Sequence, residues 1–424
     1  MPKPYVTILG KAIKTAMKLR GGGSALPGLV VEKIDPDFIK DTLAQLPQGV
    51  VVVSGTNGKT TTTKMVVELL QGQGLKVFTN RTGSNFTRGV AAALLGEVDN
   101  RGNLDADIAV LELDEAHAVH FVRSVQPRYS LLLNVMRDQL DRFGEIDTTA
   151  KLLKTIADQT TEKVIVNRED PRLLKLCKSL DPKKVGYFGL SPELRETFPT
   201  DDDMRSGGTT QSTAMAPQAI SILASFENNT AEFLIESRKL ITSLKLEGIY
   251  NIYNAAAALG LVTTIIETIN FDTLRDSLST IEPAFGRGES IIVNGRPVDL
   301  VLVKNPAGFR LSLKSFSPKG YATMIAINDN YADGRDMSWL WDVDFDSLKE
   351  NGVAAVTGVR AYDMALRLQY EEVEVAYVDT DLKKSLKDFI AHEAGTPKRI
   401  YCSYTAMLAL RRELSKIANV ENVL

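Results

Sequence analysis

The chain has 424 residues, of which 44% are hydrophobic and 24% are charged, and these proportions fit a globular protein of two or three domains. Its formal net charge of −3 excludes a general attraction to nucleic acid. Two cysteines are too few for a disulfide framework or a four-ligand zinc site, so no zinc is expected. No apolar run reaches the roughly 18 residues that span a bilayer, and no signal peptide is recognised. We therefore expect a cytoplasmic protein without a transmembrane segment.

Residues 1–47 are predicted to form an N-terminal helical segment that is too short for a separate substrate domain. Within it, residues 5–20 have the spacing of an amphipathic helix, and Gly21–Ser24 would end that helix. Apolar residues recur on one side (Val6, Leu9, Ile13, Met17) and lysines on another (Lys11, Lys14, Lys18). Two interpretations remain open: the helix packs on the next domain with its lysines in water, or it contacts an anionic membrane surface.

Residues 50–63 read VVVVSGTNGKTTTT and predict a strand, a glycine turn and the start of a helix. Gly55 and Gly58 would let the backbone approach a phosphate closely, and the N–H groups at the start of the helix would face that anion. Lys59 can reach the terminal phosphates of a nucleotide, and the Thr60 hydroxyl can bind Mg²⁺. The turn is therefore predicted to bind ATP, although its Gly-x-x-Gly-Lys-Thr spacing is shorter than the usual one.

Residues 48–286 are predicted to form an α/β domain, because β-rich runs alternate with helical ones as they do in a mostly parallel sheet covered on both faces. A helix is expected from Asn251 to about Thr268. Residues 191–217 are rich in Asp, Gly, Ser and Thr and predict an exposed loop. Strands are expected at residues 76–79, 108–113, 129–135, 163–167, 219–226 and 242–246.

A second alternation begins near Ile291 and predicts a smaller, Rossmann-like α/β domain over residues 287–424. Its strands are expected at residues 298–303, 322–327, 353–357, 373–378 and 399–402.

Glu112 and Glu115 lie at the carboxyl end of the strand predicted at 108–113. Because that edge of an open α/β sheet faces the ligand crevice, either carboxylate could complete a Mg²⁺ site with Thr60. The alternative is an acid favoured by a helix N-terminus, which applies more to Glu115 than to Glu112.

Four segments resemble the Mur ligase superfamily, the ATP-dependent amide-forming enzymes of peptidoglycan synthesis. They are the ATP loop at 55–61 (GTNGKTT), the segment 134–141 (NVMRDQLD), the helix start at 248–254 (GIYNIYN) and the junction at 286–289 (GRGE). Segments 138–147, 304–308 and 328–339 are similar to the MurT family, the Mur-ligase-like subunits of lipid II isoglutaminyl synthases. The resemblance covers essentially the whole chain, and it implies a central ATPase domain followed by the smaller domain.

The resemblance implies roles for individual residues. Lys59 and Thr60 would hold the β- and γ-phosphates and Mg²⁺ with Glu112, while Lys304 would face the transferred phosphoryl group. Taken alone, Lys304 and Arg287 would be read as solvated charges. The implied nucleotide-binding residues are Gly55, Thr56, Asn57, Gly58, Lys59, Thr60 and Thr61 in the loop, Asn251 and Asn254 at the adenine, and Arg287 at the domain junction.

Three departures from the superfamily are visible. Gln139 stands where the peptide-adding enzymes have a histidine. Lys151 and Lys154 lie near the position of their carbamylated lysine, but solvated helix lysines are the simpler account. The nucleotide-sugar-binding first domain and the zinc ribbon of many MurT-like chains are not expected here.

The implied reaction is amidation of the α-carboxylate of D-glutamate in the lipid II stem peptide, with ATP and Mg²⁺, through an acyl phosphate to D-isoglutamine. The substrate would be met at the inner face of the membrane, so a peripheral location there is open. Cys177 and Cys402 lack the motif of a glutaminase nucleophile. The resemblance therefore implies a heterodimer with a GatD-like glutaminase, whose Cys–His pair would be completed by Asp336 of this chain.

The acidic segment around Asp336 contains both tryptophans, Trp339 and Trp341, which favours a protein interface, although core packing is also compatible. Two other functions remain open. One is a self-sufficient amino-acid ligase of the Mur or folylpolyglutamate type, and the other is a nucleotide-binding scaffold without catalysis.

Overall fold

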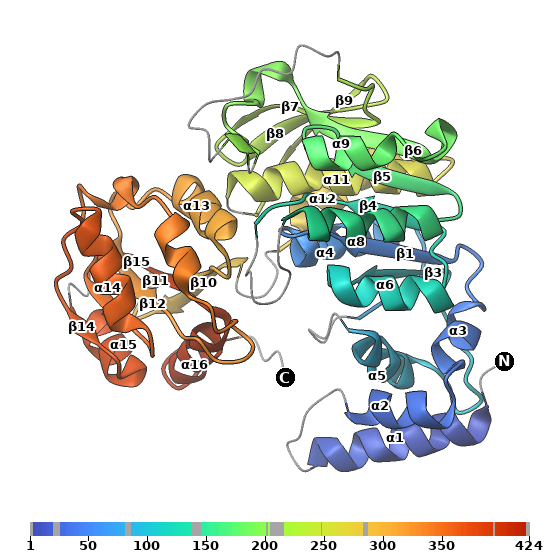
Figure 1. Cartoon of the computed structure of the whole chain (residues 1–424), viewed down its shortest axis with the longest axis horizontal. Coiled ribbons are helices and arrows are strands. Elements are labelled where there is room, and N and C mark those ends of the chain that lie inside the picture. The colour runs from blue at the N-terminus through green and yellow to red at the C-terminus, as the bar shows by residue number, and fades with distance from the viewer. Residues whose placement is uncertain are drawn as a thin grey trace.

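The computed structural model describes residues 3–19, 26–80, 86–137, 146–200, 202–203, 216–246, 248–282, 287–392 and 395–420. They form two open sheets covered by helices, placed side by side (Figure 1). The larger has nine strands in the order β2-β3-β1-β4-β5-β6-β7-β8-β9, and the smaller has six in the order β10-β11-β15-β12-β13-β14. The predicted α/β fold is confirmed. The domain boundary at 286 and 287 stays a prediction, because residues 283–286 lie outside the described ranges.

Strand β1 lies inside the larger sheet and is buried over its whole length, as expected of four consecutive valines. It pairs in parallel with β3 and β4, and Val53 lies opposite both Glu112 and Leu131. The carboxyl ends of β1 and β3 therefore meet at one edge, which places the turn after β1 beside Glu112. The parallel strands are β2 (Val77–Thr79), β3 (Ile108–Glu112), β1 (Val50–Ser54), β4 (Tyr129–Leu132), β5 (Lys163–Asn167), β6 (Val185–Leu190) and β7 (Ser221–Glu227).

An antiparallel extension of this sheet was not expected from the sequence. Strand β8 (Thr230–Ile235) follows β7 in a hairpin, and β9 covers Arg238–Ser243 rather than residues 242–246. The second hairpin turns at Glu236 and Ser237, both with positive φ, and this pair lacks the glycine that usually marks such a turn. Strand β6 was also missed because it contains two glycines. A Cβ at Gly189 would lie 2.3 Å from Nε of Arg168.

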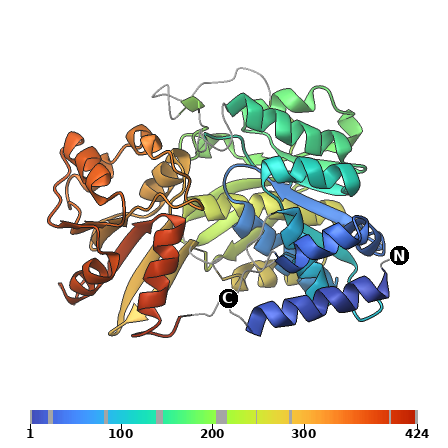
Figure 2. The same ribbon diagram turned by 60° about the horizontal axis from the view of Figure 1, so that its bottom comes forward.

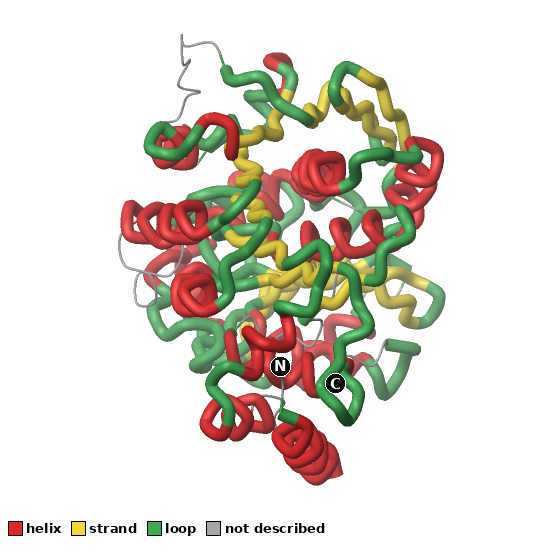
Figure 3. The backbone as a smooth tube through the Cα atoms, turned by 90° about the vertical axis from the view of Figure 1, so that its right-hand side faces the viewer, coloured by secondary structure: helices red, strands yellow, loops and turns green. Residues whose placement is uncertain are grey.

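Helices cover both faces of the larger sheet (Figure 3). One face packs on α4 (Lys59–Gly72), α11 (Ile249–Ile265) and α12 (Phe271–Thr280), and the other on α5 (Thr87–Glu97), α6 (Glu115–Ser124), α8 (Ile146–Gln159) and α9 (Pro171–Cys177). The central helix α11 is buried almost all round, which explains its run of four alanines, Ala255–Ala258. Three further helices, α1 (Pro4–Leu19), α2 (Leu26–Ile34) and α3 (Phe38–Leu43), lie at the edge beside α5 (Figures 1 and 2).

The smaller sheet is parallel except for its edge strand β10. The strand expected at 373–378 is only partly present: Val375 forms an isolated parallel bridge with Val353, and Val378–Asp379 pairs with β13. The strands are β10 (Arg287–Val293), β11 (Arg296–Leu302), β15 (Lys398–Cys402), β12 (Ala322–Ala326), β13 (Ala355–Thr357) and β14 (Val378–Asp379). The helices are α13 (Pro306–Ser315), α14 (Ala361–Tyr370), α15 (Leu382–Ala391) and α16 (Tyr404–Leu414). Within the described ranges, no helix is long and apolar enough to cross a bilayer.

A buried ion pair crosses the smaller sheet, and it yields a stability prediction. Arg399 on β15 contacts Asp299 on β11 at 3.2 Å, and each side chain is 5% exposed. Replacing Asp299→Ala leaves a buried guanidinium without its carboxylate, so we expect a loss of about 3–5 kcal/mol in the free energy of unfolding, measured by urea denaturation. The matched control is Asp346→Ala, which breaks an exposed pair with Lys349 and should lose at most about 1 kcal/mol. Equal losses in the two variants would contradict this account.

Candidate active site

The turn between β1 and α4 needs glycine at both Gly55 and Gly58, because of backbone angles and because of close neighbours. Gly55 and Gly58 have φ of +134° and +87°, which side chains rarely adopt. A Cβ at Gly58 would lie 2.7 Å from Oδ1 of Asn254 on α11, and a Cβ at Gly55 would lie 3.0 Å from the backbone N of Asn134. The turn is thus pressed against two other segments that carry polar side chains.

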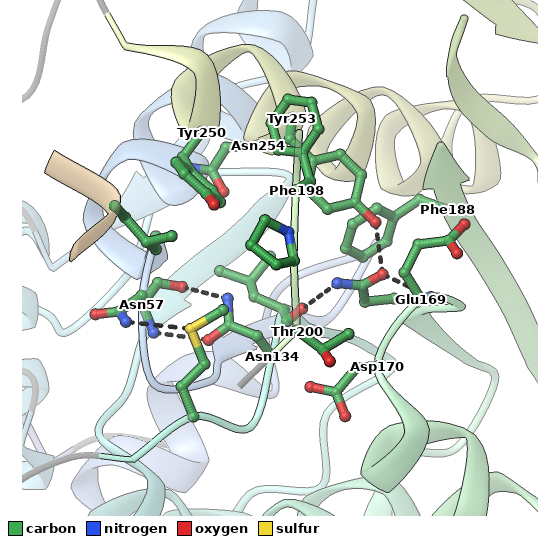
Figure 4. Close-up of a pocket in the computed structure, with 16 residues that line it drawn as sticks. Asn57, Asn134, Glu169, Asp170, Phe188, Phe198, Thr200, Tyr250, Tyr253 and Asn254 are labelled. Carbon is green, nitrogen blue, oxygen red and sulfur yellow. Dashed lines mark hydrogen bonds between the residues drawn. The ribbon is translucent and has the colours of Figure 1, made fainter. Parts of the chain in front are cut away.

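Asn134, in the segment after β4, fixes the turn by hydrogen bonds in both directions. Its Oδ1 accepts from the N–H of Asn57 at 2.9 Å, and its Nδ2 donates to the carbonyl of Asn57 at 3.0 Å (Figure 4). The N–H of Thr56 also donates to the Asn134 carbonyl, at 3.1 Å. Sequence reasoning assigned no role to Asn134. Two signals could have pointed to it: its place at the end of a strand, and its place at the start of the segment 134–141 that resembles the superfamily.

Lys59 is the buried positive charge of the site. Its side chain is 7% exposed, and its Nζ donates to the carbonyls of Gly55 and Thr56 and lies 3.3 Å from Oε2 of Glu115. Burial raises the pKa of Glu115, while Lys59 and Lys304 oppose that rise. Glu115 is therefore engaged with Lys59, and its role as a metal ligand stays a prediction.

Glu112 and Thr60 lie together at the edge of the sheet. The Thr60 hydroxyl donates to Oε1 of Glu112 at 3.0 Å, and both side chains are partly exposed. Asn80, which follows β2, holds the backbone of Glu112: its Oδ1 accepts from the Glu112 N–H, and its Nδ2 donates to the carbonyl. A carboxylate and a hydroxyl at the start of a helix are hard oxygen donors, so this pair fits Mg²⁺. Asn80 is a second supporting residue that the sequence reading missed.

A hollow beside the turn joins the two domains. Asn251 and Asn254 from α11 line it on one side, and Lys304 and Phe316 line it on the other. The side chain of Asn305, which caps α13, donates to Oδ1 of Asn57 at 3.3 Å and so bridges the domains. The structure therefore brings together three residues predicted from different parts of the chain: Asn251, Asn254 and Lys304.

A second hollow on the other side of Asn254 is lined by aromatic rings (Figure 4). Phe198 lies 5.3 Å from the rings of both Tyr250 and Tyr253, and the Tyr253 hydroxyl donates to Asn167. Phe198 is 5% exposed and Pro199 is also buried, so these two residues depart from the exposed loop expected over 191–217, whereas Pro192, Glu193 and Glu196 are exposed. The aromatic contacts of Phe198 could not be inferred from the polar composition of the segment. Residues 204–215 lie outside the described ranges.

Several predicted residues are not tested by this geometry. Arg287 begins β10 opposite Val301, but its side chain lies outside the described part of the chain. The same holds for Gln139. Lys154 forms an ion pair with Asp158 at 2.7 Å, and Lys151 is exposed, so both have the surroundings of solvated helix lysines.

The loop after β12 carries Asp336 and is fastened to the start of α16. Asp333 is 3% exposed and accepts from the Thr405 N–H at 2.7 Å and from the Thr405 hydroxyl. Asp336 is partly exposed, and hydrogen bonds from Ser338 lower the pKa of its carboxyl group. A firmly held loop thus presents an ionised carboxylate at the surface.

The two tryptophans near Asp336 have different environments: core packing applies to Trp339, and the interface interpretation stays a prediction for Trp341. Trp339 is buried and packs on Phe309, whereas Trp341 is 49% exposed and stacks edge-on with Tyr370 at 5.1 Å. Exposed apolar side chains of α14, and of Val359 just before it, extend the exposed surface that begins at Trp341. We call this surface the α14 face. It consists of Trp341, Val359, Tyr362, Leu366 and Tyr370.

Neither cysteine has the surroundings of a nucleophile. Both are buried, and burial raises the pKa of the Cys177 thiol to about 11 and that of Cys402 further. A thiol in this state is not a thiolate near neutral pH.

Comparisons with known proteins agree with this arrangement. Residues 53–262 match the family described as Mur ligase middle domain, and residues 302–407 match MurT ligase C-terminal. The chain is 29% identical to the lipid II isoglutaminyl synthase (glutamine-hydrolysing) subunit MurT of Streptococcus pneumoniae, over 96% of each chain. It is 28% identical to the MurT subunit of Staphylococcus aureus strain COL, over 96% of this chain and 97% of the relative.

Solved structures share the fold at lower identity. A pseudomurein peptide ligase type C from Methanothermus fervidus is 18% identical with a TM-score of 0.66, over 90% of this chain and 81% of its own. MurF ligase from Thermotoga maritima in complex with ADP is 18% identical with a TM-score of 0.65, over 90% and 83%.

The contact between Gly58 and Asn254 yields a binding prediction. We expect Gly58→Ala to abolish ATP binding, measured by titration with a fluorescent ATP analogue, because the added Cβ would displace Asn254 and the turn. Gly74→Ala is the matched control: Gly74 also has a positive φ, of +93°, but open space around it. Both variants should lose about 1 kcal/mol of stability from backbone strain. If Gly58→Ala bound the analogue as tightly as Gly74→Ala, the assignment of this turn to phosphate would be wrong.

Proposed function

The chain belongs to the Mur ligase superfamily, and from that premise we propose that it is the synthetase subunit of a lipid II isoglutaminyl synthase. In this role it amidates the α-carboxylate of D-glutamate in the lipid II stem peptide, giving D-isoglutamine at the expense of ATP. Similarity to MurT subunits along 96% of the chain supports the proposal, as does the match of residues 302–407 to the MurT C-terminal family.

One observation carries the catalytic part of the proposal: Asn57, Gly58 and Thr61 of the turn line a hollow that Lys304 also lines. Lys59 and Thr60 belong to the same turn, and Glu112 accepts a hydrogen bond from the Thr60 hydroxyl. ATP would place its phosphates on the turn of residues 55–61 and its adenine near Asn251 and Asn254. The N–H groups in the first turn of α4 and the ammonium of Lys59 favour that anion. Arg287 would approach the nucleotide from the domain junction.

The reaction takes two steps. A carboxylate oxygen of the substrate attacks the γ-phosphorus of ATP, so that an acyl phosphate forms and ADP leaves. Ammonia then attacks the acyl carbon, phosphate leaves with the bonding electrons, and one proton is lost to give the amide. Thr60 and Glu112 would hold Mg²⁺, which supplies charge neutralisation at the phosphates when bound. Lys59 would stabilise the charge on the phosphates, and Lys304 would face the transferred phosphoryl group.

Glu115 would support Lys59 in this reaction. A charged side chain that is only 7% exposed costs free energy unless nearby groups compensate for the lost water. Glu115 at 3.3 Å and the carbonyls of Gly55 and Thr56 supply that compensation. Glu115 therefore acts as a positioning residue for the lysine.

The ammonia would come from a partner. The buried thiols of Cys177 and Cys402 are unsuited to hydrolyse glutamine, so the proposal includes a heterodimer with a GatD-like glutaminase. Asp336 offers an ionised carboxylate that can orient the histidine of the partner's Cys–His pair. The α14 face lies in the same domain, and its exposed aromatic rings have the composition of an interface centre.

Lys59→Ala tests the ATP-dependent step. With lipid II, ATP, Mg²⁺ and ammonium, we expect this variant to lose amidation by at least about 100-fold, because the phosphate charge is no longer neutralised. Binding of the glutaminase, measured by co-purification, should be unchanged. Lys64→Ala, on the exposed side of the same helix, is the matched control and should keep its activity.

The wild-type chain should form the amide from ammonium alone, and from glutamine only with the glutaminase present. Amidation from glutamine by the isolated chain would contradict the need for a partner. Addition of an amino acid in place of ammonia would instead support a self-sufficient ligase, and failure to consume ATP would support a scaffold.

Asp336→Asn separates the partner's reaction from this chain's own. We expect the heterodimer carrying this variant to lose glutamine-driven amidation by at least about 100-fold while ammonium-driven amidation is retained, since only the partner's histidine loses its carboxylate. Asp342→Asn removes an exposed acid a few residues away and should affect neither rate. Normal use of glutamine by Asp336→Asn would remove the role of Asp336.

A further inference from the structure

Helix α1 presents an apolar face to water at the edge of the larger domain. Tyr5 is 62% exposed, Ile8 55% and Leu9 45%, and the same face continues through the exposed Ala12 and Ala16. These positions recur at intervals of three and four residues, so they form one stripe along the helix. Scattered single apolar residues on a surface are ordinary, but a continuous stripe of this kind marks an interaction site.

The orientation of α1 is fixed by close packing on its inner side. A Cβ at Gly10 would lie 2.7 Å from side-chain atoms of Val31 on α2 and Leu95 on α5. Helix α1 therefore packs closely against both of these helices. Lys14 donates to the carbonyl of Ala92 at 3.1 Å, and Lys3 pairs with Asp35 at 3.0 Å. The packing interpretation of this helix therefore accounts for its inner side, and the exposed stripe cannot be turned inward.

The charge of this region identifies the kind of surface that it fits. Residues 1–31 contain five basic residues and no acidic ones, although the whole chain has a net charge of −3. The five are Lys3, Lys11, Lys14, Lys18 and Arg20. Lys3 is paired with Asp35, and the other four positive charges would be brought together if a second copy of the chain packed face to face on this stripe, which is unfavourable. An anionic surface would be attracted instead.

We propose that α1 lies flat on an anionic phospholipid bilayer, with Tyr5, Ile8 and Leu9 in the boundary between headgroups and acyl chains. This inference rests on the proposed function, because a lipid-linked substrate is found in such a surface. Figures 1 and 2 show α1 along the rim of the molecule, where a flat surface can reach it. Its basic residues would attract the anionic headgroups while the stripe enters the interface.

The experiment measures binding of the full chain to vesicles without ATP or substrate. We expect co-sedimentation with vesicles of phosphatidylglycerol and phosphatidylcholine, weaker binding to phosphatidylcholine alone, and a loss of binding as salt is raised. The double variant Ile8→Glu, Leu9→Gln should lower the partition coefficient at least about tenfold, because two apolar side chains no longer enter the interface. Ile241→Glu is the matched control: this isoleucine on β9 is 54% exposed but lies outside the stripe, and its variant should bind like the wild type.

Three outcomes would overturn the proposal. The first is vesicle binding by the double variant equal to that of the wild type, and the second is no preference of the wild type for anionic vesicles. The third is a wild-type dimer in size-exclusion chromatography that the double variant dissociates, with no vesicle binding by either, since the stripe would then join two copies.

Activity on two forms of the substrate separates this inference from the proposed function. On detergent-solubilised lipid II with ammonium, the double variant should amidate at the wild-type rate. On lipid II embedded in anionic vesicles, its rate should fall about tenfold, in line with its weaker binding. Failure of the wild type to amidate in detergent would refute the proposed function and leave the vesicle-binding result standing by itself.

Discussion

The site depends on a single buried positive charge held over a glycine turn. Lys59 is surrounded by the carbonyls of its own loop and by Glu115, which compensate its charge in a position largely shielded from water. The rest of the larger domain serves this arrangement. The parallel pairing of β1 with β3 brings Glu112 to Thr60, and Asn134 fixes the turn from the other side. An anion that replaced part of this carbonyl shell would meet a donor already in place, which is the condition for electrostatic catalysis.

The nucleotide hollow belongs to neither domain alone. Asn251 and Asn254 come from α11, whereas Lys304 follows β11 of the smaller sheet, and the hydrogen bond between Asn57 and Asn305 links the two sides. The proposed binding of ATP in this hollow would therefore tie phosphoryl transfer to the relative position of the domains. Because each domain contributes residues to the hollow, the proposed site lies at the domain junction, where ligand sites are often found, rather than within one sheet.

The sequence predicted local features well where one physical signal dominated. The valines of β1, the glycine turn and the helix of Lys59 needed no tertiary information. It failed where contacts between distant residues decide the outcome. The strand β8 is set by a hairpin turn at Glu236 and Ser237, and the burial of Phe198 is set by rings on α11. Asn134 and Asn80 support the site through hydrogen bonds that no spacing rule anticipates. Asn251, Asn254 and Lys304 were assigned through family resemblance, and residue spacing alone would have left them as a helix cap and a surface charge.

The contrast between the two tryptophans has a spectroscopic consequence. The chain has only two such residues, and Trp339 is sealed in the core while Trp341 meets solvent beside Tyr370. Emission from Trp339 should be shifted to the blue and insensitive to soluble quenchers, whereas the red-shifted component belongs to Trp341. The fluorescence of Trp341 thus reports on any molecule that covers the α14 face. Replacing Trp341 alone would remove this signal without changing the core.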